Sequence, residues 1–209
     1  MTSLRICFVG DSITAGTVDA TFLGWPSRLC AAEVAKGHDL TEYNLGIRGD
    51  TSTDVARRWR AECDARLPDG VSTAVVFAFG INDATEEDGV VRVPLSDSVA
   101  NARSILSEAK AMGPALWIGP TPVDESRHPL RVETGQLRDK RNAWTADYNL
   151  AFRALADDVG IPYLGMMSPL INDPGWLSML SDGLHPSAAG YERMATMIGA
   201  WNAWRVLLD

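Results

Sequence analysis

Short, almost uninterrupted apolar runs alternate with longer segments of helical periodicity, and this alternation constrains the fold most. Residues 4–9 and 73–79 are apolar at nearly every position, as is typical of strands that are covered on both faces. Further strand candidates lie at 39–45, 115–119 and 161–166. Parallel strands joined by helices account for this order better than a β-sandwich does. We therefore predict an α/β fold with about five parallel strands.

Three of the connecting segments repeat apolar residues at helical spacing. They are 97–112, 137–158 and 187–207. Gly113-Pro114 and Gly160 are expected to end the first two helices before the strands that follow. The Trp and Met side chains of the third segment are expected to pack on the sheet. A homodimer contact through these side chains is the alternative.

Size and charge narrow the class of protein and of partner. A chain of 209 residues is most simply one domain, 1–209, with a sizeable core. Its net charge of −8 argues against nucleic acid or an anionic membrane surface as partner, because both reward basic patches. Three widely spaced cysteines indicate buried reduced thiols. No segment resembles a signal peptide or a spanning helix, so a cytoplasmic location is expected.

Polar or small residues follow three of the predicted strands where each strand ends. Ser12 follows the first strand, Gly46 the second and Asn82 the third. In open α/β sheets, ligands bind at the carboxyl ends of the strands. The three residues are therefore expected to converge on one edge of the sheet.

The residue types needed for nucleophilic catalysis are present at separated positions. Ser12 would need a base to activate its hydroxyl. Of the three histidines, only His185 has a carboxylate at a suitable spacing, since Asp182 precedes it by one turn period. The three side chains would form a triad in which Asp182 orients the imidazole. Taken singly, Ser12 also fits a helix N-cap and His185 a solvent-exposed loop.

Ester hydrolysis also needs hydrogen-bond donors for the oxyanion that forms in the transition state. Gly46 lies in the glycine-rich turn 44–50 and could offer its backbone N–H. Asn82, in Gly80-Ile81-Asn82-Asp83, could donate from its side-chain amide. Each segment by itself is also consistent with an ordinary β–α turn.

Taken together and in order, these segments resemble the SGNH hydrolases, also called GDSL esterases or lipases. The resemblance rests on four blocks, Gly10-Asp11-Ser12-Ile13-Thr14, Asn44-Leu45-Gly46, Gly80-Ile81-Asn82-Asp83 and Asp182-Gly183-Leu184-His185-Pro186. It implies a three-layer α/β/α sandwich of flavodoxin-like topology that needs no cofactor and no metal. It also implies that Ser12 is the nucleophile, His185 the base and Asp182 its orienting acid. The oxyanion hole would comprise the N–H groups of Ser12 and Gly46 and the Asn82 amide.

The expected function is that of a serine esterase or acylhydrolase acting on a small-molecule ester. A carbohydrate O-deacetylase that uses the same triad is the alternative. The irregular segments 120–135 and 166–181 would rim the site, and Trp176 could contact either an acyl chain or a sugar. A third hypothesis, a non-catalytic binder of a nucleotide, lacks the GxxxxGK[ST] phosphate signature.

Overall fold

The computed structural model describes residues 2–209, and its centre is a five-stranded parallel sheet in the order β2-β1-β3-β6-β9. The strands span Ser3–Gly10 (β1), Asp39–Gly46 (β2), Thr73–Ala78 (β3), Ala115–Ile118 (β6) and Tyr163–Leu164 (β9). All five correspond to strands expected from the sequence, although the last is shorter than 161–166. The prediction of an α/β fold with about five parallel strands is confirmed.

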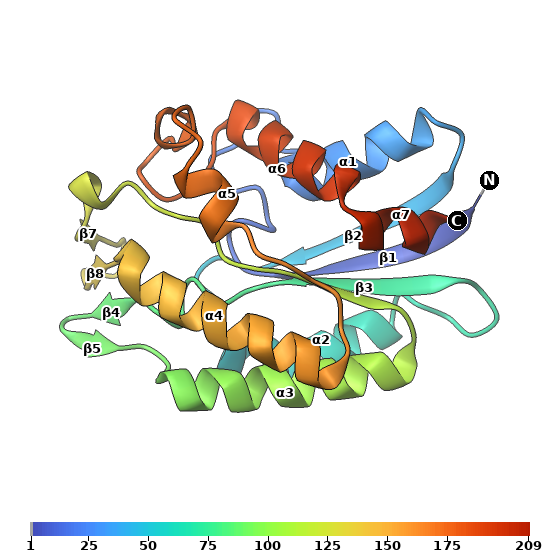
Figure 1. The fold of residues 1–209 in the computed structure, drawn as a ribbon, viewed down its shortest axis with the longest axis horizontal. Helices are drawn as coiled ribbons and strands as arrows, with labels where there is room; N and C mark the ends of the chain where they lie inside the picture. Colours follow the sequence, from blue (N-terminus) through green and yellow to red (C-terminus); the bar gives the residue numbers. More distant parts are fainter. Residues whose placement is uncertain (1) are drawn as a thin grey trace.

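Helices cover both faces of the sheet (Figure 1). One face carries α1 (Gly24–Val34), α6 (Ala188–Ala200) and α7 (Asn202–Leu208), and the other carries α2 (Ser52–Asp64), α3 (Leu95–Met112) and α4 (Asn142–Val159). Short helices occur at Met167–Ile171 (α5), Glu125–Arg127 (η1) and Leu177–Met179 (η2). The expected three-layer α/β/α sandwich is therefore confirmed.

The first strand shows why an unbroken apolar run is required. Leu4, Ile6 and Phe8 join the cluster beneath α1 and α6, whereas Cys7 and Val9 join the cluster beneath α2 and α3. Because successive side chains of a strand point to opposite faces, a strand with helices on both sides must be apolar at nearly every position. The large aromatic side chains on the two faces are almost completely buried.

Strand register brings the ends of the three central strands together. Gly10 pairs with Gly46 on β2 and with Ala78 on β3, so all three strands end at the same level. The turn after each strand therefore lies on one edge of the sheet. This edge is at the left of Figure 1 and holds the segments that begin at Ser12, 47 and 80.

A second, four-stranded antiparallel sheet lies at this same edge and was not expected from the sequence (Figure 1). Its order is β5-β4-β8-β7, with strands at Glu86–Glu87 (β4), Val90–Val91 (β5), Leu130–Arg131 (β7) and Leu137–Asp139 (β8). Each strand has only two or three residues, which is too short for a periodicity signal. The pairing of 86–91 with 130–139 joins segments about 50 residues apart in the sequence.

Two helix predictions were wrong in detail. The segment 137–158 does not begin as a helix, because Leu137–Asp139 pairs with strands on both sides and Arg141 is extended. The segment 187–207 is interrupted at Trp201, whose backbone is extended with ψ 130°. This break lets Trp204 and Leu208 of α7 reach the core. Helices α1 and α2 were not predicted.

Other expectations from the composition can be compared directly with the structure. Cys7, Cys30 and Cys63 are free and buried, so the prediction of buried reduced thiols is confirmed. The Trp and Met side chains of the C-terminal segment pack mainly into the core, with Met194 and Trp204 almost inaccessible. Among the helices of residues 2–209, none has both the length and the apolar character needed to cross a bilayer.

Candidate active site

Ser12 lies in the turn that follows β1, where the backbone is held by Asp11. Oδ1 of Asp11 accepts the N–H of Ile13 at 2.9 Å, and the Asp11 carbonyl accepts the N–H of Ala15. This Asx-type turn lifts the serine side chain off the end of the strand. Within residues 2–209 no hydrogen bond engages the backbone N–H of Ser12.

The structure brings His185 to Ser12 although 173 residues separate them in the sequence. Nε2 of His185 lies 2.9 Å from Oγ of Ser12, and Nδ1 lies 2.6 Å from Oδ2 of Asp182. Ser12 and His185 are 4% and 8% exposed, so the contact is nearly closed to solvent. The three predicted triad residues therefore form one continuous chain of hydrogen bonds.

Asp182 is held in place by more than the imidazole. Its Oδ1 accepts the backbone N–H groups of Leu184 at 3.0 Å and His185 at 2.7 Å. Partial burial opposes ionisation, but these bonds and the His185 ring hold the pKa of Asp182 well below its usual range. An ionised carboxylate at Nδ1 favours the tautomer in which Nδ1 carries the proton and Nε2 is free to accept one.

Asn82 lies in the turn after β3, 4% exposed. Its Nδ2 donates to the carbonyl of Asp50 at 2.9 Å, and its Oδ1 accepts from Nζ of Lys140 at 3.2 Å. One N–H of the amide remains for another acceptor. Asp83 is turned away and braces the loop, accepting the N–H of Ser52 at 2.7 Å and the hydroxyl of Ser98.

Gly46 has a different role from the one expected. Its N–H donates to Oδ1 of Asn44 at 3.0 Å, so it is already engaged. A Cβ at this position would lie 2.2 Å from the Ala15 backbone nitrogen, and glycine is therefore required for packing against the serine turn. This geometry counts against Gly46 as an oxyanion donor.

A second glycine in the same turn is better placed. Gly49 has φ +81°, and within residues 2–209 no hydrogen bond engages its N–H. The next residue, Asp50, accepts the Asn82 amide through its carbonyl. The signal in the sequence was Gly49 itself, in Gly49-Asp50-Thr51 directly before α2. Glycines in the left-handed region often expose their N–H groups toward a binding site.

Two basic residues near the site, Arg58 (partly buried) and Lys140 (buried), were not identified from the sequence. Arg58 on α2 donates to the carbonyls of Gly10 and Leu45, each at 2.9 Å, and contacts the carboxylate of Asp50 at 2.7 Å. It thereby joins the ends of β1 and β2. Lys140, 3% exposed, lies beneath the Asn82 turn. Their partners lie far away in the sequence, so no local pattern could reveal them.

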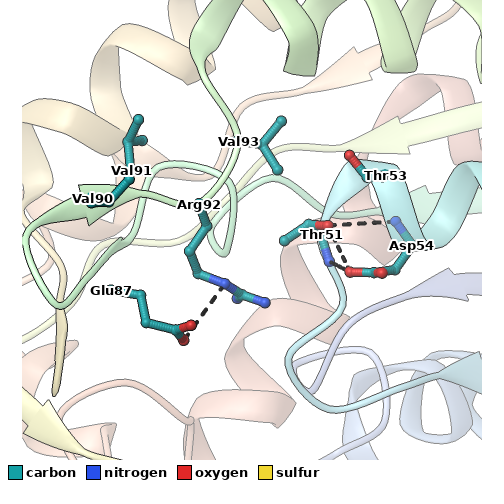
Figure 2. A pocket seen from close by; sticks show the side chains of 8 residues that line it. All are labelled: Thr51, Thr53, Asp54, Glu87, Val90, Val91, Arg92 and Val93. Atoms are coloured by element: carbon teal, nitrogen blue, oxygen red, sulfur yellow. Dashed lines mark hydrogen bonds and ion pairs between the residues drawn. The ribbon is translucent and has the colours of Figure 1, made fainter. Parts of the chain in front are cut away.

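A pocket of about 360 Å³ lies between the N-terminus of α2 and the β4–β5 hairpin. Figure 2 shows the side chains that line it. It is lined by Thr51, Thr53, Asp54, Glu87, Val90, Val91, Arg92 and Val93. Arg92 donates to the carbonyl of Gly49 at 2.9 Å, so the pocket borders the candidate oxyanion region. Ser12, Asn82 and His185 do not line it.

Neither segment expected to rim the site lines this pocket. Trp176 is fully buried, and its indole N–H donates to the carbonyl of Pro122 at 2.9 Å. It cannot contact a sugar or an acyl chain in this arrangement. Met166 and Leu170 are also buried in the core, which leaves Ile171 and Leu177 as exposed apolar side chains of the segment.

No group of three or more His, Cys, Asp or Glu side chains comes together as a metal site within residues 2–209. The candidate site consists of a serine, an imidazole, a carboxylate, an amide and backbone N–H groups. Such a set can transfer an acyl group through a covalent serine ester.

Comparison with known proteins gives matches that extend over most of the chain. The family model described as the GDSL-like lipase/acylhydrolase family matches residues 8–193. The isoamyl acetate-hydrolyzing esterase 1 homolog of Bos taurus is 30% identical over 201 residues, covering 90% of this chain and 77% of that protein. An arylesterase of Vibrio mimicus is 25% identical over 185 residues, covering 88% of this chain and 80% of that protein.

Among solved structures, the lipase/acylhydrolase from Enterococcus faecalis superposes with a TM-score of 0.79. Its sequence identity is 24%, and the superposition covers 96% of each chain. At this identity the likeness concerns the fold. It agrees with the order of strands and helices described above.

Proposed function

The chain belongs to the GDSL-like lipase/acylhydrolase family and is a carboxylic ester hydrolase, and from this premise we propose that it acts through an acyl-enzyme on Ser12. The observation that carries the proposal is the hydrogen-bonded chain from Ser12 Oγ to His185 Nε2 at 2.9 Å and from His185 Nδ1 to Asp182 Oδ2 at 2.6 Å. This geometry allows the serine to lose its proton to the imidazole as its oxygen attacks.

The reaction proceeds in two acyl-transfer steps. Ser12 Oγ attacks the ester carbonyl, and His185 accepts the serine proton and then gives it to the departing alkoxide, which leaves as an alcohol. A water molecule next gives a proton to His185 and attacks the acyl-serine. As the bond between the acyl carbon and Ser12 Oγ breaks, His185 returns that proton to Oγ, which releases the acid and restores Ser12. Asp182 stabilises the imidazolium in both steps without itself becoming protonated.

The proposed oxyanion hole differs from the sequence expectation at one position. Its donors are the N–H of Ser12, the free N–H of the Asn82 amide and the N–H of Gly49. The last replaces Gly46, whose N–H is bonded to Asn44. Donors fixed before the reaction stabilise the negative charge of the tetrahedral intermediate without reorganising.

We propose small acyl esters as substrates. The relative from Bos taurus is named for the hydrolysis of isoamyl acetate, a short acyl ester. Three of the eight residues that line the adjoining pocket are valines (Val90, Val91 and Val93), so its apolar surface is small and suits only a small alkyl group. The burial of Trp176 removes a contact that the sequence offered to an acyl chain and to a sugar alike, so a sugar O-deacetylase stays the alternative.

A series of p-nitrophenyl esters from acetate to palmitate tests the proposal. Wild type, Ser12→Ala and the matched control Ser126→Ala are compared, since Ser126 is an exposed serine outside the site. We expect turnover only in wild type and the control, with an optimum at short chains. Turnover retained in Ser12→Ala would refute the serine mechanism.

A phosphonate ester gives a second readout. Because an activated serine attacks phosphorus, wild-type protein should gain one covalent adduct, and peptide mass spectrometry should locate it on Ser12. If wild type hydrolyses acetylated sugars but no simple ester, the deacetylase alternative replaces the proposed substrate class. The roles of Ser12 and His185 are the same in both.

A further inference from the structure

Lys140 lies directly beneath the Asn82 turn, at the end of β8, and is only 3% exposed. Its Nζ donates to Oδ1 of Asn82 at 3.2 Å, to the carbonyl of Ile81 at 3.2 Å and to Oγ1 of Thr85. Lysine is among the residues least often buried in this way. The small antiparallel sheet thus brings a cation to the core side of the candidate oxyanion hole.

The hydrogen-bond pattern determines the protonation state of Lys140. The carbonyl oxygens of Ile81 and Asn82 can only accept. The hydroxyl of Thr85 already donates its one proton to the Ile81 carbonyl at 2.9 Å, so it too accepts from Nζ. Three accepting partners require three protons on nitrogen. The bonded form of Lys140 is therefore the ammonium ion.

Within residues 2–209, Lys140 has no counter-ion in direct contact, and the carboxylates of Asp11 and Asp83 favour its charge only from a greater distance. Its hydrogen-bond partners are uncharged, and it takes part in no ion pair among residues 2–209. A buried charge without a contacting counter-ion is costly, and an apolar residue of similar shape is often neutral or stabilising in its place. Lysine at this position therefore calls for an explanation other than packing.

We propose that Lys140 is a positioning residue for the oxyanion hole, one that acts through the side-chain amide of Asn82. This inference rests on the proposed function, in which that amide donates to the oxyanion. An ammonium can only donate, so it requires the oxygen of the amide to face it and turns the NH2 group toward Asp50 and the reaction site. A charged donor on Oδ1 also polarises the amide and makes its N–H a stronger donor.

The charges around Lys140 come from four parts of the chain. Asp11 follows β1, Asp83 follows β3, and Arg92 and Arg138 extend from the small sheet (Figure 2 shows Arg92). Burial lowers the pKa of His128, and its ring is also close enough for the charge of Lys140 to lower that pKa further. Burial lowers the pKa of Lys140 to about 7, and the Asp11 carboxylate opposes that fall.

A double-mutant cycle with Lys140→Met and Asn82→Ala tests the proposal, with ester turnover and thermal unfolding measured for each variant. Methionine keeps the length of the side chain and removes the charge and its hydrogen bonds. We expect Lys140→Met to lower kcat by about tenfold to a hundredfold, less than the roughly 10²–10³-fold cost of deleting an oxyanion donor. KM should stay within about twofold, because substrate binding does not use this contact.

The second leg of the cycle separates positioning from a structural effect. In an Asn82→Ala background, Lys140→Met should lower kcat by less than about twofold, because the group through which it acts is already gone. Effects that multiply in the two backgrounds would overturn the proposal, as would an unchanged kcat in Lys140→Met alone. Lys110→Met, which changes an exposed lysine on α3, serves as the matched control and should equal wild type.

Two further outcomes are distinguishable. If Asn82→Ala itself keeps kcat within about threefold of wild type, the proposed oxyanion hole fails and this inference fails with it. If Lys140→Met does not fold, Thr85→Val takes its place, since it removes one acceptor of the ammonium and leaves Asn82 intact. We then expect Thr85→Val to lower kcat about threefold to tenfold with KM unchanged. In the Asn82→Ala background, Thr85→Val should cause no further loss of kcat. An unchanged kcat in Thr85→Val would overturn the proposal.

Discussion

Asp182 binds His185 twice, through Oδ2 to the imidazole Nδ1 at 2.6 Å and through Oδ1 to the backbone N–H at 2.7 Å. The two bonds use both oxygens of one carboxylate and fix the ring relative to its own backbone. A spacing of three residues makes this possible, because one turn of chain returns the backbone N–H to the carboxylate. The imidazole therefore presents Nε2 to Ser12 before any substrate binds.

Replacing Asp182 with Asn should lower kcat by roughly 10³–10⁴-fold, because the amide can place an N–H opposite Nδ1 and favour the wrong imidazole tautomer. Ester turnover and thermal unfolding of the purified variant provide the check. Asp173→Asn, which changes a carboxylate in the preceding loop that pairs with Arg193, is the control and should retain full turnover. A loss of less than about tenfold in Asp182→Asn would remove Asp182 from the triad.

Alanine at the two glycines of the second turn should affect stability unequally. At Gly46 a Cβ meets the Ala15 backbone nitrogen at 2.2 Å, so we expect a loss of about 3 kcal/mol or more in the free energy of unfolding. At Gly49 the nearest atom is a guanidinium nitrogen of Arg138 at 3.5 Å, and only the left-handed backbone is strained. There the loss should be about 1–2 kcal/mol. Urea unfolding of both variants measures the difference, and equal losses would contradict this account of Gly46.

Arg58→Met should destabilise the fold by about 2–4 kcal/mol, because the Gly10 and Leu45 carbonyls lose a charged donor and Asp50 loses its partner. Arg57→Met is the matched control on the same helix. The Arg57 side chain is 75% exposed, and its loss should change the free energy of unfolding by less than about 0.5 kcal/mol. Denaturant unfolding of the two variants tests the prediction, which fails if both behave alike.

Asp11 should make stability depend on pH in the direction opposite to that of most carboxylates. Burial raises its pKa to about 6, against the hydrogen bond from Ile13 and the charge of Lys140. The folded state therefore binds a proton more tightly than the unfolded state, whose pKa is about 3.9. The stability that this group contributes is present at low pH and is lost as the pH rises from about 4 to 6.

Comparison with Asp11→Asn isolates this contribution from those of other carboxylates. The amide resembles the neutral acid, so the variant should gain stability relative to wild type as the pH rises, by up to about 3 kcal/mol for a shift of about two pKa units. Urea unfolding at intervals between pH 4 and 7 measures the difference. A difference that stays constant with pH would show that Asp11 is ionised throughout.

Local pattern was sufficient for the architecture and for most of the candidate site. The apolar runs of β1 and β3 indicate burial on both faces of the sheet. This signal is contained in the sequence of each strand and does not depend on which segments pack against it. A serine or asparagine directly after such a run must lie at the carboxyl edge of a parallel sheet, whichever residues surround it. Ser12, Gly46 and Asn82 could therefore be placed on one edge from the sequence alone, whereas His185 follows no strand and was assigned by its spacing to Asp182 and by the family resemblance.

Tertiary structure decided what depends on partners that are distant in the sequence. Residues 137–141 were included in the helix expected over 137–158, but the pairing of Leu137–Asp139 with β4 and β7 makes this part of the chain extended. The conformation of the turn 44–50 decides which glycine N–H is free. It places the Gly46 N–H against Oδ1 of Asn44 and leaves the N–H of Gly49 without an acceptor among residues 2–209. Trp176 could be read as a ligand contact until its burial and its bond to Pro122 were known.

The sequence by itself determined the α/β class, the parallel sheet and the edge that Ser12, Gly46 and Asn82 share. These depend on the periodicity and chemistry of neighbouring residues, which a linear pattern records. Only the tertiary structure placed Lys140 against Asn82, 58 residues away, and Arg58 against the ends of two strands. A buried polar group is satisfied by whatever the fold brings to it, so its partner is a property of the packed chain rather than of its local sequence.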